Sequence, residues 1–189
     1  MANLCSTKYR FAGSKTYKKE LQECLFKVQN NNEREEMDRY QCRFLATDIL
    51  GLKDNEINFH VRGEFYAEID VEGDLLVTTS SAWVPCEELF NRLAKKFHLE
   101  CMWLADETGN IGIWSNDVDH LFFNWEYYIE DENGCSNYFD CEADAVKFCK
   151  ELLSENGIKA TRNIKSLNDV RRVSSLSNYG IYIYNVEYE

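Results

Sequence analysis

The chain has 189 residues, of which 44% are hydrophobic and 14% aromatic, and its formal net charge is −12. This apolar content is enough to build a buried core, so the composition excludes a wholly disordered chain. No run approaches the ~18 apolar residues of a membrane helix, and the polar, basic start lacks the apolar segment of a signal peptide, so we expect a cytoplasmic protein without membrane contact.

The N-terminal part of the chain predicts a strand followed by an amphipathic helix. The strand is expected at Lys8–Phe11, and Ser14 then caps the helix. Apolar residues of this helix recur at helical spacing. They are Tyr17, Leu21, Cys24, Leu25 and Val28. The polar stretch Gln29–Asp38 predicts an exposed connection, after which a short helix is expected at Arg43–Leu50.

The next part of the chain predicts a β-hairpin and a second helix. Ile57–Val71 alternates apolar and polar residues, which indicates a strand with a break at Gly63. The turn Glu72–Asp74 joins it to a second strand at Leu75–Thr79. Pro85 then opens a helix in its first turn, where a missing N–H costs nothing. The buried stripe of this helix is expected at Leu89, Phe90, Leu93, Ala94 and Phe97.

The C-terminal part predicts further strands and helices. Strands are expected at Leu99–Ala105, Ile111–Trp114 and Leu121–Ile129. The tight-turn dipeptide Asn133-Gly134 leads to a short strand at Asn137–Phe139. Asp140 caps a helix that Gly157 ends. A short helix and a final strand are expected at Ser166–Val173 and Ile181–Tyr188.

This order of elements indicates an α+β fold. From Lys8 to Ala105 it reads β-α-β-β-α-β, which is the ferredoxin-like arrangement, and the later strands and helices would extend a mostly antiparallel sheet. We therefore expect a ferredoxin-like core at residues 1–115 with an insert near 29–55. Residues 116–189 would form an α+β extension packed on the same core.

Three short motifs accompany these elements. They are Met1-Ala2-Asn3-Leu4-Cys5-Ser6, Ser81-Ala82-Trp83-Val84-Pro85 and Glu107-Thr108-Gly109-Asn110-Ile111-Gly112. In this order the segment 1–115 resembles the YubB ferredoxin-like family, which is carried on plasmids and phages. The chain departs from the family pattern at Leu4, where a Trp is typical, and at Val84, where a proline pair is typical. The resemblance implies a ferredoxin-like core and a mobile-element origin, but no activity and no functional residue.

The spacing of the cysteines and histidines predicts reduced cysteines and no metal site. The chain has 8 cysteines and no C-x-x-C pair, so we expect free thiols, no metal and no cofactor. The nearest potential zinc cluster, His120 with Cys135 and Cys141, has wider spacing than structural zinc sites use. A nucleophilic cysteine is conceivable at Cys86 or Cys141 near a helix start, although neighbouring acids would raise the thiol pKa.

All the excess negative charge falls in one segment. Residues 97–146 contain 12 acids and no Lys or Arg, together with Trp103, Trp114 and Trp125. Such a field repels phosphate backbones, so nucleic-acid binding is disfavoured despite a basic patch around Lys8, Arg10 and the lysines near residue 18. The simplest interpretation is an acidic, solvated surface.

The sharper interpretation is a docking surface for a protein partner with a basic surface. Carboxylates would stand in for phosphates and aromatic rings would supply the strong contacts. The residues expected at this surface are Asp117, Asp119, Glu126, Tyr128, Glu130, Asp131 and Glu132. Our leading hypothesis is a non-enzymatic binding module, an acidic inhibitor or nucleic-acid mimic, with no catalytic residue. The alternatives are a small metal-dependent hydrolase using acids around Asp106–Asp119 and an accessory protein whose acidity has no role.

Overall fold

The computed structural model describes residues 4–31, 41–107, 112–158 and 163–189. The fold is α+β, and the described residues form eight strands and five α-helices. They divide into two compact units: residues 1–122 with Glu189, and residues 123–188. Most of the predicted exposed connection at 29–38 lies outside the described residues, and its first residue, Gln29, ends a helix.

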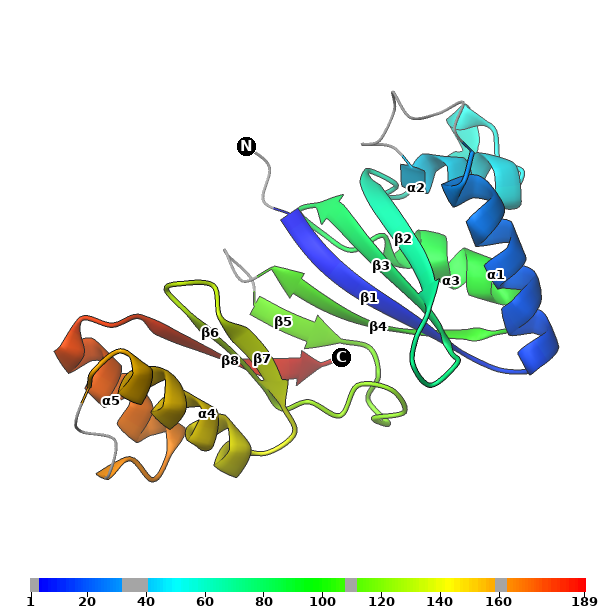
Figure 1. Ribbon diagram of the computed structural model, residues 1–189. Helices are drawn as coiled ribbons and strands as arrows, with labels where there is room; N and C mark the ends of the chain where they lie inside the picture. The colour runs from blue at the N-terminus through cyan, green and yellow to red at the C-terminus, as the bar shows by residue number, and fades with distance from the viewer. Residues whose placement is uncertain (1–3, 32–40, 108–111, 159–162) are drawn as a thin grey trace. The chain divides into compact units, whose positions relative to one another are not determined.

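The first unit contains a five-stranded sheet with helices on one side (Figure 1). Its elements are β1 (Leu4–Ala12), α1 (Lys15–Gln29), α2 (Gln41–Phe44), a π-helical turn (Leu45–Ile49), a 3-10 turn (Asp54–Glu56), β2 (Gly63–Ile69), β3 (Leu75–Ala82), α3 (Glu87–Lys96), β4 (Glu100–Glu107) and β5 (Gly112–Ser115). The strand order is β2-β3-β1-β4-β5, and neighbouring strands are antiparallel.

Helix α1 forms as the sequence predicts. The Ser14 hydroxyl accepts the N–H of Tyr17 at 3.3 Å, which satisfies one of the free donors of the first turn. The apolar face of the helix buries Leu21 and Leu25 in the first core. Helical periodicity therefore places this helix on the sheet, as expected.

The centre of the first core is an aromatic pair between β1 and α3. The rings of Tyr9 and Phe90 stack with their centroids 3.9 Å apart, and neither side chain is accessible to solvent. Burying an apolar side chain such as Phe90 contributes about 1.5–3 kcal/mol, so this contact helps to hold α3 on the sheet.

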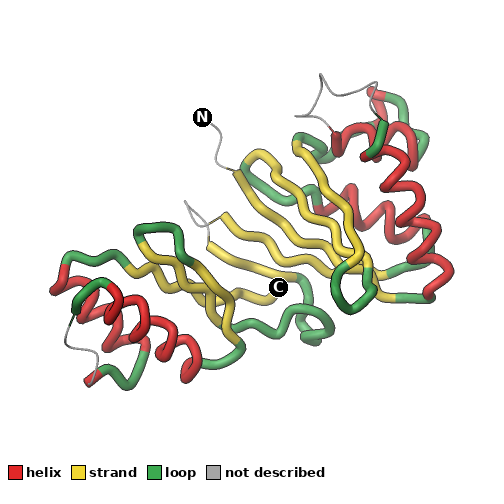
Figure 2. Tube along the Cα trace, viewed as in Figure 1, coloured by secondary structure: helices red, strands yellow, loops and turns green. Residues whose placement is uncertain are grey.

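The second unit contains a three-stranded antiparallel sheet with two helices on one side (Figure 2). Its elements are β6 (Tyr127–Asp131), β7 (Ser136–Phe139), α4 (Glu142–Glu155), α5 (Leu167–Ser177) and β8 (Ile181–Tyr188). The strand order within this unit is β8-β6-β7. Helix α5 begins at a capping box, in which Ser166 and Asp169 each accept the other's backbone N–H.

The second unit has a core of its own. Ile129 from β6 packs with Cys149 and Leu153 of α4 and with Val170 of α5. The predicted boundary lay after residue 115, but residues 116–122 belong to the first unit. The Asn116 side chain holds this segment to β4, because its amide accepts the N–H of Trp103 at 2.7 Å. The predicted packing of the extension on the first unit stays a prediction.

Two predicted strands are wrong in part. Residues 121–126 are irregular, and β6 begins only at Tyr127, because the Asp117 carboxylate accepts the N–H groups of Leu121 at 2.9 Å and Phe122 at 2.7 Å. Residues 57–61 contribute apolar side chains to the core without joining the sheet, and β2 begins at Gly63. A Cβ at Gly63 would lie 2.9 Å from the carbonyl oxygen of Ser80, so only glycine allows this close approach.

Two helices begin later than the sequence predicts. Helix α3 begins at Glu87 with Cys86 as its N-cap, and α4 begins at Glu142 with Cys141 as its N-cap. Pro85 therefore precedes the N-cap and does not occupy the first turn. The predicted hairpin, the short strand β7 and the final strand β8 are confirmed. Among the described helices, none has the length and apolar character that a membrane crossing requires.

Candidate functional site: the open face of the second sheet

The three strands of the second unit have one face packed on helices and one face free of them. Side chains alternate between the two faces along a strand. Ile129 and Ile183 lie opposite each other on the helix side and belong to the second core. Tyr128 and Glu130 therefore point to the other face, which we call the open face. In the described part of this unit both helices pack on the opposite side.

The open face is rich in aromatic side chains because three strands contribute them in register. Tyr128 lies directly opposite Tyr138 of β7 and Tyr184 of β8. Glu130 lies directly opposite Tyr182. Residues paired across strands in this way have Cβ atoms about 4.5–5.5 Å apart, so their side chains touch. The strand pairing thus collects residues that are far apart in the sequence.

Ring contacts extend this set into a continuous aromatic row. We use this name for Phe123, Trp125, Tyr138, Tyr128 and Tyr184. Trp125 and Tyr138 stack with centroids 4.6 Å apart, and Tyr138 and Tyr128 follow at 4.7 Å. Offset and tilted pairs at these distances each contribute about 0.5–1.5 kcal/mol beyond their buried area. The row is therefore a connected set of rings rather than five independent side chains.

The segment that precedes β6 is held in place by Tyr188. The Tyr188 hydroxyl donates to the carbonyl oxygens of Phe123 at 2.8 Å and Trp125 at 2.7 Å. A single phenol that bridges two carbonyls would share its proton between them, so this segment is fixed against β8 without belonging to a strand. This contact positions the Trp125 ring at the end of the aromatic row.

Carboxylates border the aromatic row. Glu126 and Glu132 are exposed, and Glu130 is half-buried. Glu132 is oriented by Gly180, since its carboxylate accepts the Gly180 N–H at 3.1 Å and its own N–H donates to the Gly180 carbonyl at 3.0 Å. Within the described ranges, no Lys or Arg forms an ion pair with Glu126, Glu130 or Glu132. These carboxylates are therefore not neutralised by cations of the described chain.

Two residues of the second unit that were expected at the docking surface are buried. Tyr128 is only 8% exposed because Tyr138 and Tyr184 flank it, so it supports the row from within. Asp131 is only 4% exposed and lies on the helix side of the sheet. Its carboxylate accepts the N–H groups of Asn133 at 2.9 Å and Cys135 at 2.8 Å, which closes the β6–β7 turn. Neither residue offers a carboxylate or a full ring to a partner.

The other two predicted site residues belong to the first unit. Asp117 is buried, and its carboxylate holds the loop after β5 by accepting the two N–H groups described above. Asp119 is exposed in the same loop. The structure therefore joins Glu126, Glu130 and Glu132 in one unit and leaves Asp117 and Asp119 in the other.

The acids of the alternative hydrolase site do not converge. Asp106 and Glu107 are neighbours in β4 and so point to opposite faces of the sheet. Glu107 is buried on the helix side, whereas Asp106 is paired across the sheet with Ser6 and Ile113. The Asp117 carboxylate is engaged by backbone N–H groups, and among the described residues none of these acids belongs to a group of three possible metal ligands.

The cysteines are free thiols in the structure, and most of them are buried. Among the described residues, one group of possible metal ligands approaches within 4.8 Å, namely Asp140, Cys141 and Asp144. The Cys141 thiol lies 3.5 Å from the Asp144 carboxylate, and both acids are exposed at the start of α4. This group differs from the cluster considered from the sequence, because neither His120 nor Cys135 belongs to it.

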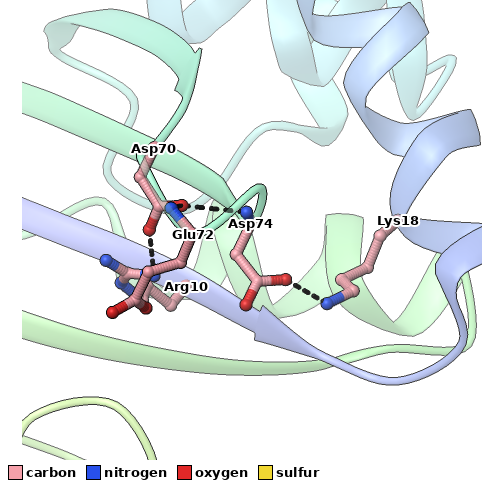
Figure 3. Close-up of polar contacts among 5 residues, drawn as sticks. All are labelled: Arg10, Lys18, Asp70, Glu72 and Asp74. Atoms are coloured by element: carbon pink, nitrogen blue, oxygen red, sulfur yellow. Dashed lines mark hydrogen bonds and ion pairs between the residues drawn. The ribbon is translucent and has the colours of Figure 1, made fainter.

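The basic patch considered from the sequence is largely paired with acids. Figure 3 shows Arg10 and Lys18 beside the β2–β3 turn. Arg10 pairs with Asp70 at 2.5 Å, and Lys18 pairs with Asp74. These cations hold a hairpin to β1 and α1, so they do not offer free positive charge to a phosphate backbone.

Sequence reasoning missed Tyr138, Tyr182 and Tyr184 as members of the site. The sequence could have placed Tyr182 and Tyr184 on one face, because side chains alternate along the predicted strand at 181–188. It could not have placed them beside Glu130, since that position depends on the pairing of β8 with β6.

Comparisons with known proteins identify no family for this chain: no family model matches it, and neither a curated protein nor a solved structure shows significant similarity.

Proposed function

We propose that this protein is a non-enzymatic protein-binding module, and that the open face of the second sheet docks a partner with a basic surface. The observation that carries the proposal is the combination of un-neutralised carboxylates at Glu126, Glu130 and Glu132 with the aromatic row beside them. Aromatic anchors surrounded by complementary charge are typical of protein interfaces.

The character of the partner follows from the same charges. A partner with Lys and Arg at its surface gains from the carboxylates, and residues 97–146 contain no Lys or Arg that would compete for them. Proteins that bind nucleic acids carry such surfaces. The proposal therefore includes inhibition by acidic mimicry, in which this face occupies the nucleic-acid site of a basic host or defence protein.

For the first unit we propose a ferredoxin-like fold. Its support is the element order β1-α1-β2-β3-α3-β4, with additional turns before β2, and the antiparallel strand order β2-β3-β1-β4. The same arrangement is what the resemblance to the YubB family implies. In this proposal the first unit is a scaffold, and binding belongs to the second.

The test compares two variants with the same loss of charge. The first carries Glu126→Gln, Glu130→Gln and Glu132→Gln on the open face. The second carries Glu151→Gln, Glu155→Gln and Glu187→Gln, which are exposed positions of the same unit and outside the open face. Each purified protein is used to capture partners from host lysate, and the affinity of any purified partner is then measured by calorimetry.

We expect the partner to bind the unchanged protein and the second variant alike. The open-face variant should bind about tenfold more weakly or worse, a loss of about 1.4 kcal/mol, and binding should weaken with salt. Equal binding by both variants would show that total charge, and not this face, attracts the partner.

A further inference from the structure

We propose that the open face recognises arginine in particular, and that its occupant is an arginine-containing segment of the basic partner held at Tyr182, Glu130 and Glu132. This inference rests on the proposed function and adds the chemical identity of the recognised side chain. It is carried by the arrangement around Tyr182, by the charge of its neighbours and by a matching arrangement elsewhere in the chain.

Tyr182 is the most accessible ring of the open face, with 51% of its surface exposed. Glu130 lies directly across from it in β6. One step further along the same strand pair, Gly180 lies opposite Glu132 and carries no side chain that would separate Glu132 from Tyr182. A Cβ at Gly180 would lie 3.3 Å from the Tyr182 hydroxyl and 3.4 Å from the Glu132 carboxylate. One exposed ring therefore has two carboxylates beside it, both from the β6 side.

This arrangement suits a guanidinium group better than an ammonium group. A guanidinium is flat and can lie on an aromatic ring, and its N–H groups form two parallel hydrogen bonds with one carboxylate. An ammonium is a compact charge that gains from the carboxylates but little from the ring. The carboxylates therefore select for charge, and the Tyr182 ring selects for arginine.

The first unit of the same chain contains the proposed combination with its arginine present. The guanidinium of Arg92 lies 4.5 Å from the centre of the Phe59 ring, and its Nε donates to the Glu88 carboxylate at 2.6 Å. One ring and one carboxylate thus hold one guanidinium. At Tyr182 the ring and the carboxylates are present, and no described Lys or Arg forms an ion pair with Glu130 or Glu132.

The test uses the 189-residue protein with three synthetic peptides of equal length. One alternates glycine with arginine, one glycine with lysine, and one glycine with citrulline, which is flat but uncharged. Affinities are measured by calorimetry, and NMR shifts of the tyrosine rings locate the binding. We expect the arginine peptide to bind at least about threefold more tightly than the lysine peptide, and the citrulline peptide not to bind measurably.

Two variants assign the preference to its residues. Tyr182→Leu keeps an apolar side chain but removes the ring, so it should abolish the difference between the arginine and lysine peptides. Glu130→Gln should reduce the affinity for the arginine and lysine peptides by a similar factor. Tyr66→Leu is the matched control, because Tyr66 is an exposed strand tyrosine of the first unit.

The outcomes separate this inference from the proposed function. Equal affinity for arginine and lysine peptides, with loss of both in Glu130→Gln, would overturn the arginine preference and leave the basic-partner proposal intact. Binding of neither basic peptide would overturn both. Tight binding of single-stranded nucleic acid to the aromatic row would also overturn both. If Tyr182→Leu still bound the arginine peptide more tightly than the lysine peptide, a residue other than Tyr182 would be responsible for the preference. That result would contradict the role proposed for Tyr182.

Discussion

The hydroxyl of Tyr179 donates a hydrogen bond to the carboxylate of Asp131 and so ties the residue before Gly180 to the end of β6. Burial opposes ionisation of Asp131, but hydrogen bonds from Tyr179, Cys135 and Asn133 outweigh it, and the pKa of Asp131 is lowered. Burial and the Asp131 carboxylate raise the pKa of Tyr179 to about 12. This contact fixes the strand ends that carry Glu130, Glu132 and Tyr182.

Substitution of Asp131 by Asn should destabilise the second unit. At neutral pH we expect a loss of about 1–3 kcal/mol of unfolding free energy, because a buried carboxylate that accepts several hydrogen bonds is replaced. A lowered carboxyl pKa stabilises the folded state above the unfolded pKa of about 4, and this contribution is lost as pH falls through the lower folded value. The difference between the two proteins should therefore narrow in acid. Urea unfolding from pH 7 to pH 3 measures it, with the exposed Asp119→Asn as control.

A cost for Asp131→Asn that stays constant from pH 7 to pH 3 would contradict the role of the ionised carboxylate.

The β2–β3 turn contains a second carboxyl group with a shifted pKa, that of Asp70. Burial opposes ionisation of Asp70, but the Asp74 N–H and Arg10 outweigh it and lower the pKa of Asp70. Arg10→Gln should therefore raise the pKa of Asp70 toward its ordinary value. Glu72→Gln removes a negative charge from the same exposed turn but keeps the backbone N–H that residue 72 donates to Asp70, so it should alter the pKa of Asp70 little. Carboxyl carbon NMR titration measures both, and an unchanged Asp70 midpoint in Arg10→Gln would refute the role of the ion pair.

The sequence predicted correctly those helices and strands that are determined by neighbouring residues in the chain. Ser14 and Ser166 mark the starts of α1 and α5 because the side chain that caps each helix is adjacent to it. Period-2 alternation likewise predicted the final strand at 181–188. The helix caps and the strand alternation do not depend on contacts with residues far away in the sequence.

The errors arose where a distant or buried polar contact decides the structure. Aromatic alternation over 121–126 suggested a strand, but the Asp117 carboxylate takes two of the backbone N–H groups that a sheet would need. Asp131 was expected at the surface, because nothing in the local sequence shows that Tyr179 approaches it. The negative charge of the sequence predicted an exposed surface, but two of the acids, Asp117 and Asp131, are buried and accept hydrogen bonds within the protein.

The edge of β2 is covered by glutamine side chains. The Gln29 amide accepts the Ala67 N–H at 2.6 Å and donates to the Ala67 carbonyl at 3.4 Å, as a neighbouring strand would. Gln41 accepts the Phe65 N–H at 3.4 Å. Exposed strand edges promote association between chains, so these side chains protect the edge.

Gln29→Ala should therefore cost about 1 kcal/mol of unfolding free energy and favour self-association. The control is Gln22→Ala on the same helix, which should change neither property by a comparable amount. Urea unfolding and light scattering over a range of protein concentrations measure the two effects. A Gln29→Ala protein as stable as the unchanged chain would show that water replaces the amide at no cost.

The free thiols should differ widely in reactivity because the fold exposes them unequally. Cys135 is exposed, whereas five cysteines are buried. The buried ones are Cys5, Cys42, Cys86, Cys101 and Cys149. Burial raises the pKa of Cys5 to about 11 and that of Cys149 to about 12. Because the thiolate is the reactive form, both burial and the raised pKa protect these side chains.

Alkylation by iodoacetamide at pH 8, followed by peptide mass spectrometry, should modify Cys135 first and the buried cysteines much more slowly, through the small unfolded fraction. Cys135→Ser should remove the fast phase and leave the slow one unchanged. Adding urea below the unfolding midpoint should accelerate the slow phase in proportion to the unfolded fraction, because the core must open before the reagent enters. Modification of Cys5 or Cys149 at the rate of Cys135 in the folded protein would contradict the packing of these two cores.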